Sequence, residues 1–120
     1  MPSDPITRHM RGMRSNLVRE RLRRFAAGHR EKPLGIVSYD VASANNAVAV
    51  AIAHFIFGHS VRARVNGGTK EYRYPGFIEK EGVVWLGQSV FLLTLQRSRE
   101  LQDFLASKGA AYEVLSVRVG

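Results

Sequence analysis

The sequence contains no cysteine, few acidic residues and no long hydrophobic run. Without cysteine, disulfide frameworks, thiolate zinc sites and cysteine nucleophiles are excluded. The N-terminal region lacks the continuous apolar segment of a signal peptide, and no apolar run approaches the ~18 residues needed to span a bilayer. No phosphate-binding Lys-Ser pair follows the glycine turns at residues 66–68 and 74–76. We therefore expect a cytoplasmic protein with no membrane span and no cofactor.

Basic residues outnumber acidic ones and are concentrated near the N-terminus. The chain has 18 Lys and Arg against 10 Asp and Glu, a formal net charge of +8. Residues 1–33 hold nine basic and three acidic residues, a net of +6, whereas residues 34–120 hold nine and seven, a net of +2. Such a balance favours contact with a polyanion. We expect a basic arm and helix over residues 1–33 and a single α+β domain over residues 34–120.

Hydrophobic periodicity and turn residues divide the chain into helices and strands. A mobile arm over residues 1–12 is expected to precede a helix that begins near Ser15 or Asn16 and ends at Gly28. The other expected elements are a strand at 34–40, a helix capped by Ser43 and ending at a left-handed Gly58, hairpin strands at 60–66 and 69–74, a helical turn within 75–82, one long strand at 83–93 with a bulge at Gly87, a helix at 96–108 and a strand at 111–119.

This order of elements predicts an α+β protein. A strand, a helix, a hairpin, a further strand, a helix and a last strand come close to a ferredoxin-like βαββαβ-type sandwich. The additions are one extra strand and a basic N-terminal helical extension. We predict this fold for the chain.

The helix before Gly58 is unusual because it carries no charge. No Asp, Glu, Lys or Arg occurs between Val41 and His59. A helix that is apolar on nearly every side should be covered on more than one side. We expect the sheet to cover one side, and either the N-terminal helix or a partner subunit to cover another. A homodimer, formed through this helix or through an exposed sheet edge, is the expected assembly.

The hairpin sequence VRARVNGGTKEYRY admits two registers. A two-residue loop places Tyr72 and Tyr74 on the face of the strand valines, so that the tyrosines enter the core and the arginines face solvent. A three-residue loop instead places Arg62 and Arg64 beside the tyrosines, in a mixed aromatic and basic strip. The two-residue loop is favoured, because Asn-Gly and Gly-Gly are the usual residues of such turns. Arg62 and Arg64 also fit an ordinary solvated strand face.

The predicted function is nucleic-acid binding, with DNA or RNA as the partner and with little sequence specificity. Arginines would contact phosphates, and exposed tyrosines would stack on bases. The residues expected to bind phosphate are Arg14, Arg19, Arg21, Arg23, Arg24, Arg62, Arg64, Lys70 and Arg73, and those that would stack if exposed are Tyr72 and Tyr74. No catalytic or metal-binding residue is expected in this interpretation.

Two alternatives remain open at this point. The pair Tyr39-Asp40 ends the first strand and resembles the strand-end aspartate of small CRISPR-associated nucleases, which are ferredoxin-like dimers. That resemblance implies a metal-dependent nuclease with Asp40 as a ligand. The other alternative is an assembly subunit of a ribonucleoprotein or a viral particle, whose basic arm threads along nucleic acid. His54 and His59 are five residues apart and are expected to be packed or capping residues rather than metal ligands.

Overall fold

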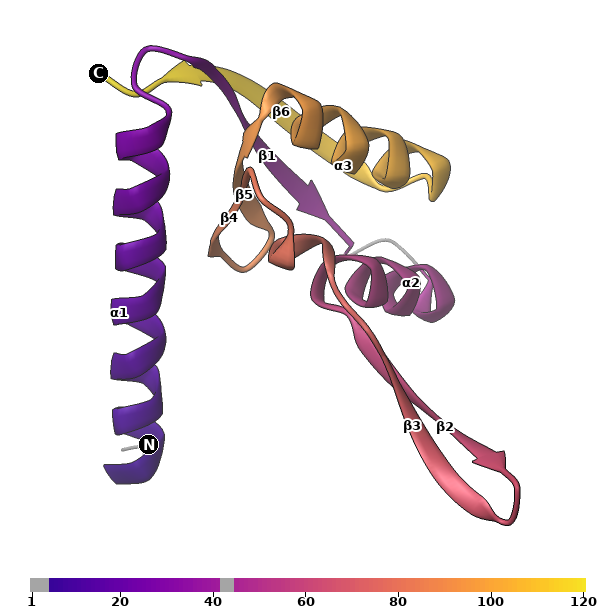
Figure 1. Ribbon diagram of the computed structural model, residues 1–120. Coiled ribbons are helices and arrows are strands. Elements are labelled where there is room, and N and C mark those ends of the chain that lie inside the picture. The colour runs from indigo at the N-terminus through magenta and orange to yellow at the C-terminus, as the bar shows by residue number, and fades with distance from the viewer. Residues whose placement is uncertain (1–4, 42–44) are drawn as a thin grey trace.

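The computed structural model describes residues 5–41 and 45–120, with side chains described from Leu17 onward. It contains three α-helices, six strands and one 3-10 turn within these ranges (Figure 1). In chain order they are α1 (Pro5–Gly28), β1 (Pro33–Asp40), α2 (Asn46–Phe57), β2 (His59–Val65), β3 (Gly68–Tyr74), η1 (Phe77–Glu79), β4 (Val83–Gly87), β5 (Val90–Thr94), α3 (Leu95–Ser107) and β6 (Ala111–Arg118). The expected α+β class is confirmed.

Four strands form one antiparallel sheet in the order β4-β5-β1-β6, and β2 pairs only with β3. The central strand β1 places Val37 and Tyr39 on the sheet face that α2 and α3 cover. Ile52 and Ile56 of α2 and Leu101 and Leu105 of α3 pack there, and none of these four is more than 1% exposed. This layer is the main hydrophobic core.

The opposite face of the sheet receives the end of α1. Phe25 packs with Leu34, Val84 and Leu92 in a second buried cluster, and Leu22 lies against it. Of the two alternatives for the second cover of the uncharged helix α2, the N-terminal helix does not fit, because α2 lies in the first cluster and α1 in the second. Farther along this face Leu115 is 64% exposed. The last turns of α1 thus cover only one end of the outer face.

Helix α1 is longer than the sequence predicted. It begins at Pro5, not near Ser15, so most of the expected mobile arm is helical, while residues 1–4 lie outside the described ranges. Proline is tolerated in the first helical turn, where its missing N–H has no intrahelical partner. A single glycine such as Gly12 costs a helix about 1 kcal/mol without ending it. The helix ends at Gly28, as expected.

The predicted long strand at 83–93 is two strands. β4 and β5 form a hairpin, with Gln88 at a φ of 42° in the turn between them. The pairing shifts between Trp85 and Gly87, so the expected irregularity is present, but the chain also reverses there. Gly-Gln-Ser offers residues that tolerate a tight turn, and reversal lets both apolar strands lie in one sheet.

The ends of α2 differ in detail from the prediction. Asn45 caps the helix, its side-chain oxygen accepting a hydrogen bond from the Val48 N–H at 2.9 Å, whereas the predicted cap Ser43 lies outside the described residues. Gly58 ends the helix with a φ of 80° and a ψ of 175°. The positive φ was expected, but this extended region is not the left-handed helical cap and is open essentially only to glycine.

The β2–β3 hairpin projects away from the rest of the molecule, as does the N-terminal half of α1 (Figure 1). The radius of gyration is 17.0 Å. A compact chain of this length would have a radius of gyration of about 14 Å. The difference comes from these two projecting elements, and it means that their surfaces are not part of the core.

The base of the hairpin is fixed by contact between two glycine backbones. A Cβ atom added at Gly76 would collide with the backbone of Ile56, Phe57 and Gly58 at the end of α2. A Cβ atom added at Gly58 would lie 2.5 Å from the carbonyl oxygen of Tyr74. Gly58 and Gly76, where the end of α2 meets the segment after β3, therefore both have to be glycine.

We predict that Gly76→Ala destabilises the protein, because the methyl group has only backbone atoms to displace. Overpacking of this kind costs about 1–3 kcal/mol. The measurement is the free energy of unfolding in urea. Gly28→Ala is the matched control, since a Cβ atom at Gly28 meets nothing within 4 Å. Equal stability of the two variants would contradict a tight contact at the hairpin base.

Candidate functional site

The arginines of α1 lie on an exposed helical surface. Arg19, Arg21, Arg23 and Arg24 are all exposed, and the side chain of Arg14 lies outside the described residues. Arg24 pairs with Glu20 at 3.1 Å, but both side chains are more than half exposed, so the pair adds little stability. These cations are therefore accessible to a ligand from solvent.

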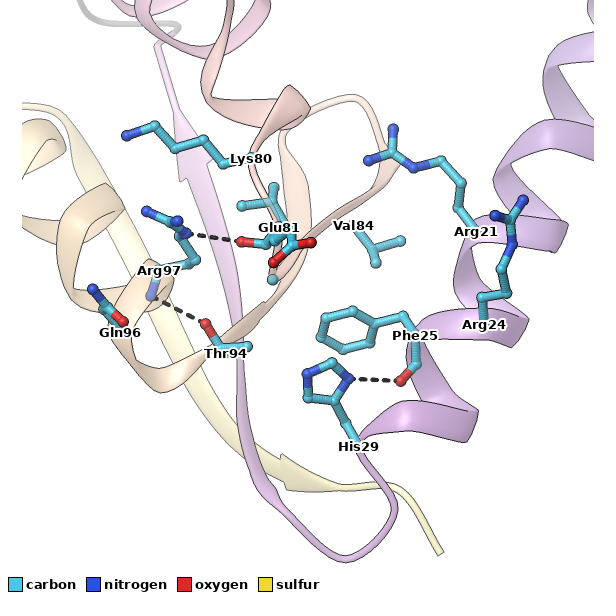
Figure 2. A pocket seen from close by; sticks show the side chains of 12 residues that line it. Arg21, Arg24, Phe25, His29, Lys80, Glu81, Val84, Thr94, Gln96 and Arg97 are labelled. Atoms are coloured by element: carbon cyan, nitrogen blue, oxygen red, sulfur yellow. Dashed lines mark hydrogen bonds between the residues drawn. The ribbon is translucent and has the colours of Figure 1, made fainter.

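A groove of about 670 Å³ runs between α1 and the β4 side of the sheet (Figure 2). Arg21 and Arg24 line it from α1, and Lys80 and Arg97 line it from the opposite wall. The Arg21 guanidinium donates a hydrogen bond to the carbonyl oxygen of Ile78 at 3.2 Å, which connects α1 to the segment after the hairpin. Sequence reasoning found the two arginines of α1 but not Lys80 or Arg97, which approach them only in the folded chain.

Carboxylates offset much of the positive charge in this groove. Arg97 makes two hydrogen bonds to Glu100, at 2.7 and 2.8 Å, and donates a third to the carbonyl oxygen of Glu81. Lys80 lies 3.6 Å from the same Glu100, and the Glu81 side chain also lines the groove. The hydrogen bond from Arg97 is the main cause that lowers the pKa of Glu100. The positive charges of Arg97 and Lys80 lower it further. The groove is therefore less basic than its arginines and lysine suggest.

The hairpin has the register of a two-residue loop. Val65 pairs with Gly68, Arg62 with Glu71 and Val61 with Tyr72. Asn66 and Gly67 have φ angles of 48° and 78°. Positive φ at both positions is typical of a type I′ turn, which matches the twist of the strands. The favoured register is confirmed.

This register separates two faces of the hairpin. The arginine face carries Arg62, Arg64 and Arg73 together with Glu71. The aromatic face carries Val61, Ala63, Val65, Lys70, Tyr72 and Tyr74. The cations expected to bind phosphate therefore lie on both faces, because Lys70 accompanies the tyrosines.

The aromatic face does not enter the core, and here the prediction was wrong. Tyr72 is 38% and Tyr74 52% exposed, and the valines beside them are also exposed. The two-stranded hairpin forms its own sheet, separate from the one that contains β1, and most residues on both of its faces are exposed. Lys70 lies over the Tyr72 ring, with its Nζ 5.3 Å from the ring centroid. Tyr72, Tyr74 and Lys70 thus form a mixed aromatic and basic strip, although this register was expected to bury the tyrosines.

Glu79 in η1 connects the arginine face to the hairpin base. Its carboxylate accepts hydrogen bonds from the Gly76 N–H at 2.6 Å and from the Arg73 guanidinium at 2.7 Å. The Gly76 N–H lowers the pKa of Glu79, and the Arg73 charge lowers it further. Of the three arginines on this face, Arg73 therefore has a carboxylate partner in the folded chain.

Three aromatic rings stack at the hairpin base. The centroids of His54 and His59 are 4.3 Å apart with an interplanar angle of 12°, and those of His59 and Tyr74 are 4.9 Å apart with an angle of 14°. The sequence predicted that both histidines are packed, but their stacking with Tyr74 was not predicted. Helical spacing is a poor guide here because His59 lies beyond the helix end, where Gly58 turns the chain back.

Asp40 lies exposed at the end of β1. Among the described side chains, of residues 17–41 and 45–120, no group of three His, Asp or Glu is placed to hold a metal ion. The nuclease alternative stays a prediction.

Searches against protein-family models, curated proteins and solved structures found no match for this chain.

Within the described ranges, no helix combines the length and the apolar character needed to cross a membrane.

We predict that the carboxyl of Glu79 titrates below the ordinary value of about 4.3, and that Arg73→Gln raises this pKa only in part, since the hydrogen bond from the Gly76 N–H, the largest single cause, remains. Carboxyl NMR titration measures both pKa values. A carboxyl whose pKa is lower in the folded state stabilises the fold above pH ~4.3. This stabilisation is lost as the pH falls through the pKa of the folded state. The stability difference between the wild type and Glu79→Gln should therefore shrink in acid. Full return to the ordinary pKa in Arg73→Gln would show that Arg73 is the main cause.

Proposed function

We propose that this protein binds DNA or RNA through phosphate contacts made by arginines of α1 and of the β2–β3 hairpin. The observation that carries the proposal is the hairpin, which stands clear of the core with Arg62 and Arg64 exposed on one face and Lys70 on the other. Arg19, Arg21, Arg23 and Arg24 add an exposed basic helix. Two basic projections on one small protein suit a ligand whose charge is repeated along its length.

Phosphate contacts of this kind give affinity with little sequence specificity. Arginine and lysine neutralise backbone charge and release counterions, whatever the bases are. Arg62 and Arg64 lie on the same face of β2, so they are about 7 Å apart along the strand. Such a row of cations follows a backbone rather than a single base.

For the fold, we propose a ferredoxin-like variant in which the β2–β3 hairpin is an insertion. The order β4-β5-β1-β6 supports this, because helix α2 leads from β1 to β4 across β5, and helix α3 leads from β5 to β6 across β1. Omitting the hairpin leaves a βαββαβ chain with one antiparallel sheet and both helices in the core on one face.

We also propose a homodimer. Support comes from the face of α2 that the core does not cover, where Val50 is 42% and Phe57 40% exposed on a helix without charged residues. Sedimentation equilibrium tests this, and Val50→Lys should shift the protein to monomer. A wild type that is monomeric at all concentrations would contradict it.

The test of nucleic-acid binding is fluorescence anisotropy with labelled duplex DNA, single-stranded DNA and structured RNA, each titrated at several salt concentrations. Affinity should fall steeply with salt. Failure to bind any of the three at low salt would contradict the proposal and favour an assembly subunit that binds nucleic acid only beside other chains.

We predict that Arg62→Gln/Arg64→Gln and Arg19→Gln/Arg23→Gln each weaken binding and reduce the slope of log K against log salt. The reduction should be about 0.7–0.9 for each phosphate that the variant no longer neutralises. The matched control is Arg99→Gln/Lys108→Gln, which removes two exposed cations from α3 and its end. An equal reduction in the control would show that only the net charge matters and not these two surfaces.

A further inference from the structure

A second cavity, of about 280 Å³, opens at the base of the hairpin. Its walls include the stacked rings of His54, His59 and Tyr74, and also Pro75, Phe77 and Lys80. The cavity thus combines flat aromatic surface, an apolar wall and one cation. These are the elements that hold a nucleobase attached to a phosphate.

The stack of three rings ends at an accessible one. His54 and His59 are nearly parallel, and Tyr74 continues the stack with half of its surface exposed. Packing against His59 holds the Tyr74 ring in one orientation before any ligand binds. A pre-oriented ring loses little conformational freedom when a base stacks on it, which favours binding.

His59 adds a polar group without a partner. Its Nδ1 is buried and has no hydrogen-bond partner among the described residues. Buried polar atoms are normally paired, because leaving one unpaired costs the desolvation free energy of the group. This nitrogen lies within the ring stack, and a base stacked on the free face of Tyr74 has the Tyr74 ring between itself and His59, so the base site does not depend on it.

Lys80 supplies one cation beside the cavity, and Glu100 offsets part of its charge. Lys80 is paired with Glu100 at 3.6 Å, and its side chain is half exposed. A long, exposed ion pair of this kind contributes little and does not hold the ammonium in place. From Tyr74 the aromatic face continues to Tyr72 and Lys70 along β3, which gives a strand of nucleotides a path away from the cavity.

We infer that this cavity binds one unpaired base of a single-stranded nucleic acid, stacked on Tyr74, with the flanking backbone along the aromatic face of the hairpin. The inference rests on the proposed function and narrows its ligand class. A base in a duplex is already stacked and paired, so it cannot present its flat surface to Tyr74 without being displaced.

The test compares Tyr74→Leu, Tyr74→Phe and the wild type by anisotropy at one low salt concentration. The ligands are a labelled single-stranded decamer of deoxyadenosine and the same decamer with abasic sugars. Tyr74→Leu should bind the base-bearing decamer about 5- to 150-fold more weakly. Its affinity for the abasic decamer should not change. Tyr74→Phe keeps the ring and should retain wild-type affinity, and Leu115→Ala, at an exposed residue of β6 outside the hairpin, is the matched control.

Each unfavourable result contradicts a different claim. Binding of the decamer that ignores Tyr74→Leu, or an equal weakening on both decamers, overturns the base site while leaving the proposed function standing. Failure of the wild type to bind either decamer or a duplex contradicts the proposed function itself. Free deoxyadenosine monophosphate that binds as tightly as the decamer would assign the cavity to mononucleotides and overturn the single-strand inference.

Discussion

The close backbone contact between Gly58 and Gly76 determines where the β2–β3 hairpin lies. At these positions the end of α2 and the exit of β3 approach so tightly that neither residue can carry a side chain. The hairpin consequently leaves the domain as a separate two-stranded sheet instead of adding its strands to the edge of the main sheet. Its two exposed faces, the Glu79 contact with Arg73 and the stacked rings at its base all depend on this position.

An isolated two-stranded hairpin is marginally stable in water, so this one needs support from elsewhere. Three features support the hairpin, either at its tip or at the base where it joins the domain. The type I′ turn at Asn66 and Gly67 matches the strand twist, Glu79 caps the Gly76 N–H and binds Arg73, and His59 stacks between His54 and Tyr74. Between base and tip, cross-strand pairs hold the two strands together. The hairpin can therefore present side chains to a ligand on both faces while its base stays fixed.

Local signals in the sequence predicted most elements and the hairpin register, but not how the elements share the core. The Asn-Gly-Gly sequence favoured a two-residue turn, and the alternation of the strands then placed Arg62 and Tyr72 on opposite faces. Nothing local shows which sheet a strand joins, so Tyr72 and Tyr74 were predicted to be buried although they are exposed. The same reason explains β4 and β5, whose apolar residues resemble one strand until the chain reverses at Gln88. The groove beside Lys80 joins residues far apart in sequence, and no spacing rule finds it, whereas the contact of His59 with Tyr74 follows from the hairpin register once the strands extend to the hairpin base.

Chemical-shift mapping tests the central claim, that the projecting hairpin contacts nucleic acid, most directly. Backbone amide resonances of the ¹⁵N-labelled protein would be followed while an unlabelled single-stranded decamer is added. We expect the largest shifts in β2 and β3, at the hairpin base around His59 and Tyr74, and on the exposed side of α1 around Arg19 and Arg23. Shifts confined to α3 and β6, with the hairpin unchanged at saturation, would contradict the account.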